Sequence, residues 1–248
     1  MNLIKNIKFP NIRKLFIPDP GYLIVDTDLS GADAQIVAWE TGEKELKDAL
    51  RSGKKIHAMV AKELYGSSGQ PYYDMTKRRI HATNYGGGAK KLHQTLAGQF
   101  GTEYTSLEQE KDFQSYWFDK YPGVKDWHNR IKRELEETCG VTNRFGYKIT
   151  YQDRIDTVFN RALAWVPQST VALLTSRGML AIKDNFPMAE ILMQVHDSII
   201  FQIPIKHKKQ LYDIKDMLNS LTVPYPDPLN IPWSVDFSTK SWGDVVCL

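Results

Sequence analysis

The chain has 248 residues, of which 42% are hydrophobic and 25% charged, a composition that allows a buried core and excludes wholesale disorder. Its formal net charge of +3 neither requires nor excludes a nucleic-acid partner, and its two cysteines are too few for a disulfide framework. The longest apolar runs are strand-sized and no signal-peptide segment precedes the first charges, so we expect a soluble, intracellular protein without a membrane span.

The first part of the chain is predicted to contain one buried strand followed by helices. Residues 21–28 (GYLIVDTD) form an apolar run after a Pro-Asp-Pro-Gly turn and predict the strand. Helices are predicted over residues 32–66, with an interruption near Gly53, and over 75–85. Three glycines, 86–88, follow and would cost a helix about 2–3 kcal/mol relative to alanine. They have two interpretations, a hinge or a C-terminal cap and turn.

The second part of the chain predicts more helices and a hairpin. Helices are expected over 106–120 and 124–137, a strand pair over 140–151, and a long helix over 158–183 that Pro167 should kink. Residues 191–203 predict a strand, a tight turn and a strand, with His196, Asp197 and Ser198 at the tip. A helix over 211–221 and a last strand over 233–237 follow. This order predicts an α+β body with a helical insertion between two halves of a sheet.

Two aspartates stand at the ends of predicted strands. Asp28 closes the first strand, and Asp197 lies in the turn of the hairpin. Held on neighbouring strands, the two carboxylates could share Mg²⁺, which prefers a few carboxylate oxygens together with waters and substrate phosphates. Each residue also has a purely structural interpretation, because Asp28 could cap the following helix and Asp197 could be an ordinary turn residue.

A basic helical face is the second candidate for chemistry. Lys77, His81 and Tyr85 are spaced i, i+4 and i+8, so they share one face of the predicted helix. With Arg78 beside them, this face could hold a triphosphate. The alternative is a basic amphipathic helix on the surface.

Several segments resemble family A (DNA polymerase I-like) DNA polymerases. Residues 28–33 (DLSGAD) resemble the family's motif A, and residues 195–197 (VHD) resemble its motif C. The spacing is similar too, since Arg13 lies 15 residues before Asp28 and His57 lies 29 after it. Further similar features are the segments YPGV at 121–124, Gln168-Ser169 and SWGD at 241–244. The resemblance covers nearly the whole chain.

The resemblance implies a fold and an activity. It implies an antiparallel-sheet polymerase palm (residues 1–45 and 155–248) with a helical fingers insertion (46–154), and without thumb and exonuclease domains. The implied activity is template-directed addition of dNMPs to a primer 3′ end with two Mg²⁺ ions, in the cytoplasm of a bacterium or phage-infected cell. The implied partners are primer-template DNA, dNTPs and a separate polypeptide that supplies the thumb and exonuclease-like domains, although a truncated piece would look the same.

The resemblance also implies roles for single residues. Asp28 and Asp197 would ligate both metals, and Asp33 stands where the family has the glutamate that excludes a ribose 2′-hydroxyl. Aspartate is one methylene shorter, so the strictness of ribonucleotide rejection is open. Ser198 stands where the family usually has a glutamate directly after the motif C aspartate. The implied contacts to primer and template are His196, Gln168, Arg161 (with Asn160 as a competitor for its place), Arg144 and Arg13.

Two alignments of the basic helix are possible. The gapless one places Lys77 at a family arginine, His81 at the key lysine and Tyr85 at the following aromatic residue, and it is preferred. His81 would then donate a proton to pyrophosphate, as a weaker fixed charge than lysine. The other alignment requires a gap and places Lys77 at the key lysine and Tyr85 at a later Tyr-Gly pair.

Two other functions compete with a DNA polymerase. Single-subunit RNA polymerases share the palm, but Asp33 at the sugar position favours DNA synthesis. A non-catalytic, palm-derived DNA-binding or scaffold subunit is the second alternative. Retention of both Asp28 and Asp197 argues against it, because a scaffold needs no metal ligands.

Overall fold

A computed structural model describes residues 11–248, which divide into two compact units. The sheet unit comprises the described part of Met1–Ala32 together with Val171–Val223 and Asn230–Leu248. The helical unit comprises Asp33–Thr170 and Pro224–Leu229. These divisions follow residues 32 and 170, whereas the sequence suggested divisions after residues 45 and 154.

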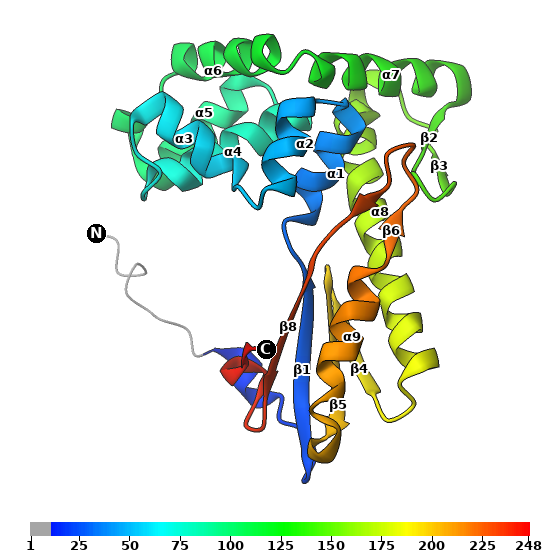
Figure 1. The fold of residues 1–248 in the computed structure, drawn as a ribbon. Coiled ribbons are helices and arrows are strands. Elements are labelled where there is room, and N and C mark those ends of the chain that lie inside the picture. Colours follow the sequence, from blue (N-terminus) through cyan, green and yellow to red (C-terminus); the bar gives the residue numbers. More distant parts are fainter. Residues whose placement is uncertain (1–10) are drawn as a thin grey trace. The chain divides into compact units, whose positions relative to one another are not determined.

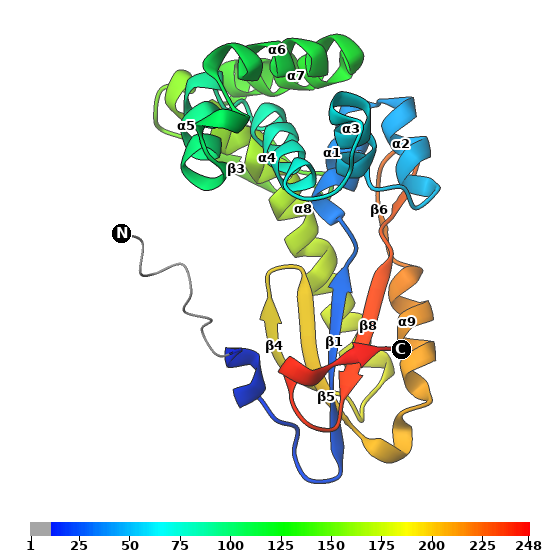
Figure 2. The same cartoon turned by 90° about the vertical axis from the view of Figure 1, so that its left-hand side faces the viewer.

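The sheet unit is built on a five-stranded antiparallel sheet of order β4-β5-β1-β8-β9. The central strand β1 lies between β5 and β8 (Figures 1 and 2). The strands are β1 (Tyr22–Leu29), β4 (Glu190–Val195), β5 (Ser198–Pro204), β8 (Trp233–Ser238) and β9 (Val246–Cys247). The predicted first strand, hairpin and last strand are therefore confirmed.

The two faces of the sheet are covered by different elements. Because side chains alternate along a strand, Val25 and Thr27 point to one face and Ile24, Asp26 and Asp28 to the other. On the first face, α9 (Gln210–Asn219) packs with the C-terminal part of α8 (Ile155–Asn185). A Cβ on Gly178 of α8 would lie 3.0 Å from the Trp233 ring, so helix and sheet are in close contact there. The opposite face therefore carries the aspartates.

The helical unit contains α1 to α7, the N-terminal part of α8 and a short hairpin (Figure 1). Its main core gathers buried side chains of α7 and α8, including Trp127, Ile131 and Leu163. The elements are α1 (Ala32–Thr41), α2 (Lys44–Arg51), α3 (Ile56–Tyr65), α4 (Tyr72–Asn84), α5 (Ala89–Phe100), α6 (Leu107–Lys120), α7 (Gly123–Thr138), β2 (Gly140–Thr142) and β3 (Lys148–Thr150).

Short elements complete the fold. They are the 3-10 helices η1 (Ile12–Leu15), η2 (Thr102–Tyr104), η3 (Ile205–His207) and η4 (Trp242–Asp244), and the paired strands β6 (Thr222–Val223) and β7 (Leu229–Asn230). Among the helices of the described residues, none has the length and apolar character needed to cross a membrane.

Helix α5 was not predicted from the sequence. Its only buried side chains are Leu92 and Leu96, which leave a weak apolar pattern along the sequence. Helix α8 is assigned as continuous over 31 residues with Pro167 inside it, so the proline does not end it. A second interruption at Gly42, with φ +72°, divides the predicted 32–66 helix into three pieces instead of two.

Candidate active site

The sheet unit brings Asp28 and the hairpin tip together. Asp28 pairs with Ser198 across β1 and β5, and the Ser198 hydroxyl donates a hydrogen bond to Asp28 Oδ1 at 2.8 Å. Asp197 precedes Ser198 in the β4–β5 turn. The turn is closed by His196, whose φ of +59° is in the left-handed region that non-glycine residues rarely adopt. This arrangement fixes both carboxylates at the same end of β1.

The pKa of Asp28 reflects the crowding of negative charge. Burial is the largest cause that raises the pKa of its carboxyl, and the charges of Asp197 and Asp26 raise it further, against the hydrogen bond from Ser198. A divalent cation would relieve this repulsion. The described residues contain no cluster of three His, Cys, Asp or Glu side chains that could hold a metal. A two-carboxylate site nevertheless fits Mg²⁺, which usually keeps several waters and binds substrate phosphates.

The helical unit contains a cationic cavity of about 660 Å³. One face of α4 contributes Asp74, Lys77, Arg78 and His81, which follow the i, i+3, i+4, i+7 spacing. With Lys91 of α5, three cationic side chains and one histidine line the cavity, together with a single carboxylate, that of Asp74. The complete lining is Asp74, Lys77, Arg78, His81, Ala82, Gly87, Gly88, Lys91, Leu92, Thr95 and Asn160.

Tyr85 does not line this cavity. It is 9% exposed and belongs to the core around Trp127, and its hydroxyl donates a hydrogen bond to Asp33 Oδ1. Burial and the nearby Asp33 charge raise the Tyr85 pKa, so the phenol stays neutral. The other oxygen of Asp33 lies 3.2 Å from His81 Nε2. Asp33 thus connects α1 to His81 of α4 and to Tyr85 at its C-cap, and of these two side chains only His81 reaches the cavity.

The glycine run after α4 forms a helix cap. Gly86 has φ +71°, the Gly86 N–H donates to the Thr83 carbonyl at 3.1 Å, and the Gly87 N–H donates to the Ala82 carbonyl at 2.7 Å. This pair of bonds is the Schellman motif. Gln114 Nε2 also donates to the Gly87 carbonyl at 2.6 Å. Of the two interpretations of these glycines, the geometry favours the cap.

The predicted primer and template contacts differ in availability. His196, Gln168 and Arg161 are exposed, and Arg161 lies 3.6 Å from Asp153. Arg144 is engaged elsewhere, because the buried Glu40 accepts two hydrogen bonds from its guanidinium, at 2.6 and 2.7 Å.

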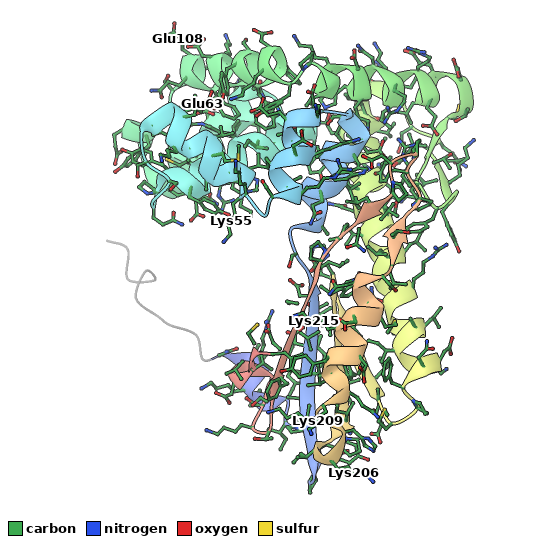
Figure 3. The ribbon with its side chains drawn as sticks, in the orientation of Figure 1. Lys55, Glu63, Glu108, Lys206, Lys209 and Lys215 are labelled. Atoms are coloured by element: carbon green, nitrogen blue, oxygen red, sulfur yellow. The ribbon has the colours of Figure 1, made fainter. Side chains whose placement is uncertain are left out.

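Arg13 lies in the sheet unit, stacked on Trp242 with 4.4 Å between the guanidinium carbon and the ring centroid. By contrast, the basic run at 206–209 lies at the far end of β5 from Asp28, around η3 and the start of α9, where Figure 3 labels Lys206 and Lys209.

Sequence reasoning missed part of the cavity lining. Asp74, Thr95 and Asn160 were not singled out as nucleotide-binding residues. The i, i+3 spacing of Asp74 to Lys77 could have indicated Asp74. Thr95 could not be found without α5, since only that helix places it one turn after Lys91.

Comparison with known proteins agrees with this architecture. The POL domain of Pol1 from M. smegmatis, solved in complex with DNA primer-template and dNTP, matches with a TM-score of 0.79 at 22% identity, over 96% of this chain and 44% of that chain. This likeness shows that the fold, an antiparallel sheet with helices, is that of a polymerase domain.

Comparison of the amino-acid sequence shows to which family the chain belongs. The pattern of DNA polymerase family A matches residues 3–244, and the chain therefore belongs to that family. It is 29% identical over 250 residues to DNA polymerase I of Helicobacter pylori, covering 94% of this chain and 26% of that protein. It is 24% identical over 238 residues to the DNA polymerase of Mycobacterium phage D29, covering 94% of this chain and 37% of that protein. The chain thus spans well under half the length of these relatives.

Proposed function

We propose that this chain is the catalytic part of a template-directed DNA polymerase that adds dNMPs to a primer 3′ end by phosphoryl transfer. The observation that supports it most is the pairing of Asp28 with the Asp197 turn at one end of β1, in a chain of DNA polymerase family A. The Ser198 hydroxyl holds the Asp28 carboxylate, and the left-handed turn at His196 places Asp197 at the same end of β1, which supports a shared role over separate structural ones.

The two aspartates would hold two Mg²⁺ ions. When bound, these ions lower the pKa of the attacking hydroxyl and neutralise the charge that develops on the leaving pyrophosphate. The protein's own contribution is preorganisation: Ser198 holds the Asp28 carboxylate by its 2.8 Å hydrogen bond, and the left-handed turn at His196 holds Asp197.

The cationic cavity would bind the triphosphate of a dNTP. Lys77, Arg78 and Lys91 supply fixed positive charge, which complements the phosphates. His81 adds charge only when its imidazole is protonated, and in that state it is also able to donate a proton to pyrophosphate. Asp33 would lie near the sugar, where its hydrogen bond from Tyr85 and its contact with His81 fix the carboxylate.

The partners follow from the same proposal. Primer-template DNA would contact the exposed residues His196, Gln168, Arg161 and Arg13. Arg144 is the least available of the proposed DNA contacts, because Glu40 already binds its guanidinium. A separate polypeptide would supply the thumb and exonuclease-like domains.

Extension of a labelled primer-template by one nucleotide, at low salt with Mg²⁺, tests the proposal. The expected result is incorporation of the complementary dNTP in preference to the matching rNTP. Preference for rNTP would instead indicate an RNA polymerase-like enzyme. A folded chain that binds primer-template but incorporates neither nucleotide would contradict the proposal and favour a DNA-binding or scaffold subunit.

A further inference from the structure

One guanidinium is held by two independent contacts on the face of the sheet that carries Asp28. Arg13 of η1 lies over the indole of Trp242, with the guanidinium carbon 4.4 Å from the ring centroid. The same guanidinium lies 4.0 Å from Asp26 Oδ2. Half of the Arg13 side chain (52%) remains exposed. Stacking on an aromatic ring leaves the in-plane N–H donors of arginine free for an anion.

Trp242 is itself fixed beneath Arg13. Its indole N–H donates to Asp26 Oδ2 at 2.6 Å, its backbone N–H donates to the Phe16 carbonyl at 2.8 Å, and its ring packs on Ile24 and Ile200. The next residue allows this close approach, because a Cβ on Gly243 would lie 2.5 Å from the Lys14 side chain. The aromatic platform is therefore rigid.

Asp26 supplies the charge that keeps the arginine in place. It is 7% exposed, and its Oδ1 has no hydrogen-bond partner within residues 11–248. Within the described part of the chain, its negative charge is compensated by the indole N–H and by the guanidinium at 4.0 Å. A buried, partly compensated carboxylate attracts the nearest cation strongly, because the surrounding dielectric is low.

The position of this arginine relates it to the candidate active site. Asp26 and Asp28 are two residues apart on β1 and point to the same face, so they are separated by about 7 Å along the strand. Ile24 and Ile200, on which Trp242 packs, point to that face as well. The exposed edge of the guanidinium thus lies next to Asp26, on the same face of the sheet as the Asp28 carboxylate where primer chemistry is proposed.

We infer that Trp242 and Asp26 are positioning residues that hold Arg13 as a preformed binding group for a backbone phosphate of the primer-template. This inference rests on the proposed function. Arg13 is the residue that touches the phosphate, whereas Trp242 and Asp26 act through it.

A double-mutant cycle on DNA binding tests the inference. Affinity for a primer-template is measured over a range of salt concentrations, without Mg²⁺, for Arg13→Ala, Trp242→Leu and the double variant. Arg13→Ala should weaken binding about two- to tenfold and reduce the salt slope by about 0.9, as expected for one lost phosphate contact. Trp242→Leu should reproduce most of this loss, and the double variant should bind no more weakly than Arg13→Ala.

Two further variants and one control complete the cycle. Trp242→Phe keeps an aromatic face without the indole N–H and should lose less affinity than Trp242→Leu. Asp26→Asn removes the negative charge but retains an oxygen that accepts from the indole N–H. Its effect on DNA affinity should also be non-additive with that of Arg13→Ala. This variant tests the inference if Trp242→Leu does not fold. Lys206→Ala removes the same charge from an exposed site at the far end of β5 from Asp28, and should be additive with Trp242→Leu.

The outcomes separate this inference from the proposed function. The inference alone is overturned if the unmodified chain binds DNA and extends primers, but the effects of Arg13→Ala and Trp242→Leu on DNA affinity are additive. An unchanged salt slope in the folded variants would overturn it in the same way. A change in KM for dNTP with unchanged DNA affinity would also overturn it, because the phosphate would then belong to the nucleotide. Absence of DNA binding by the unmodified chain would overturn both.

Discussion

At the scale of single residues, electrostatics distinguish Asp28, which is proposed to bind metal, from a core side chain such as Tyr85. Asp28 is held in a crowded, partly buried position that raises its carboxyl pKa, whereas Tyr85 is neutral and buried. Such a carboxylate is unfavourable for the fold unless a cation binds it, as the proposed function requires. Stability and activity should therefore respond in opposite directions when it is changed.

Asp28→Asn should stabilise the chain in the absence of divalent cations. A carboxyl whose folded pKa is raised loses stability as the pH rises through that pKa, so at neutral pH the neutral amide is favoured. The expected gain is roughly 1 kcal/mol in the free energy of unfolding, measured by urea denaturation with EDTA. Asp213→Asn, at an exposed site on α9, is the control and should leave stability unchanged. A destabilised Asp28→Asn protein would contradict this account of the site.

His57 should make stability fall at mildly acidic pH. Burial, together with the positive charges of Lys77 and His81, lowers its pKa to about 4. The unfolded chain therefore takes up a proton below about pH 6.5 that the folded chain does not, and stability decreases as the pH falls from 6.5 toward 4. Between pH 7 and pH 5 the loss should reach about 2 kcal/mol in urea denaturation. His57→Phe should remove this part of the pH dependence; an identical pH dependence in that variant would show that His57 is not its source.

At the scale of elements, helix α4 and its cap organise the cationic cavity. The exposed face of α4 carries the cations, and its C-terminal end is fixed by the glycine cap and by α6, since Trp117 Nε1 donates to Asn84 Oδ1 at 2.8 Å. The opposite face of α4 is anchored by the buried pair of Arg79 with Glu110 of α6. The helix is therefore held at both its end and its inner face.

Gly86→Ala should destabilise the chain by roughly 1–3 kcal/mol. The residue has φ +71°, and a Cβ there would lie 2.6 Å from Asn160 Oδ1. Gly88→Ala is a matched control two residues on, where φ is −72° and nothing lies within 4 Å of an added Cβ. Thermal and urea denaturation of the two variants decide the matter. Equal stability of both would mean that the glycine run is a flexible hinge and not a cap.

Glu110→Gln should cost about 3–5 kcal/mol, because it leaves the Arg79 guanidinium buried without its counter-ion. The measurement is the free energy of unfolding in urea. The double variant Arg79→Met with Glu110→Leu should be more stable than Glu110→Gln, since it removes both charges. The reverse order would show that the pair contributes more than the cost of burying it.

At the scale of the whole molecule, the chain spans 26% of the length of its Helicobacter pylori relative. Phosphate contacts supply much of the affinity of DNA-binding proteins, and the proposed contacts on this chain are few. We therefore expect the chain by itself to add only a few nucleotides per binding event. Extension in the presence of a heparin trap measures this number. Long products under the trap would contradict the proposed need for a separate polypeptide.

The sequence predicted the strands and the longest helices well, because their apolar runs and Gly-Pro punctuation are strong local signals. Asp28 and Asp197 could be selected because each stands at the end of such a run. Helix α5 could not be predicted, since Leu92 and Leu96 are its only buried side chains and give a weak apolar pattern. The engagement of Arg144 by Glu40 and of Tyr85 by Asp33 is likewise beyond sequence, because both contacts depend on long-range packing.

The most direct test of the central claim is single-turnover incorporation of one dNMP at increasing Mg²⁺, with the unmodified chain, Asp28→Asn, Asp197→Asn and the control Asp213→Asn. We predict Mg²⁺-dependent extension by the unmodified and control chains, and a loss of at least about a hundredfold in each of the two active-site variants. Extension that persists in a folded Asp28→Asn or Asp197→Asn variant would contradict the assignment of these aspartates as the metal-binding pair.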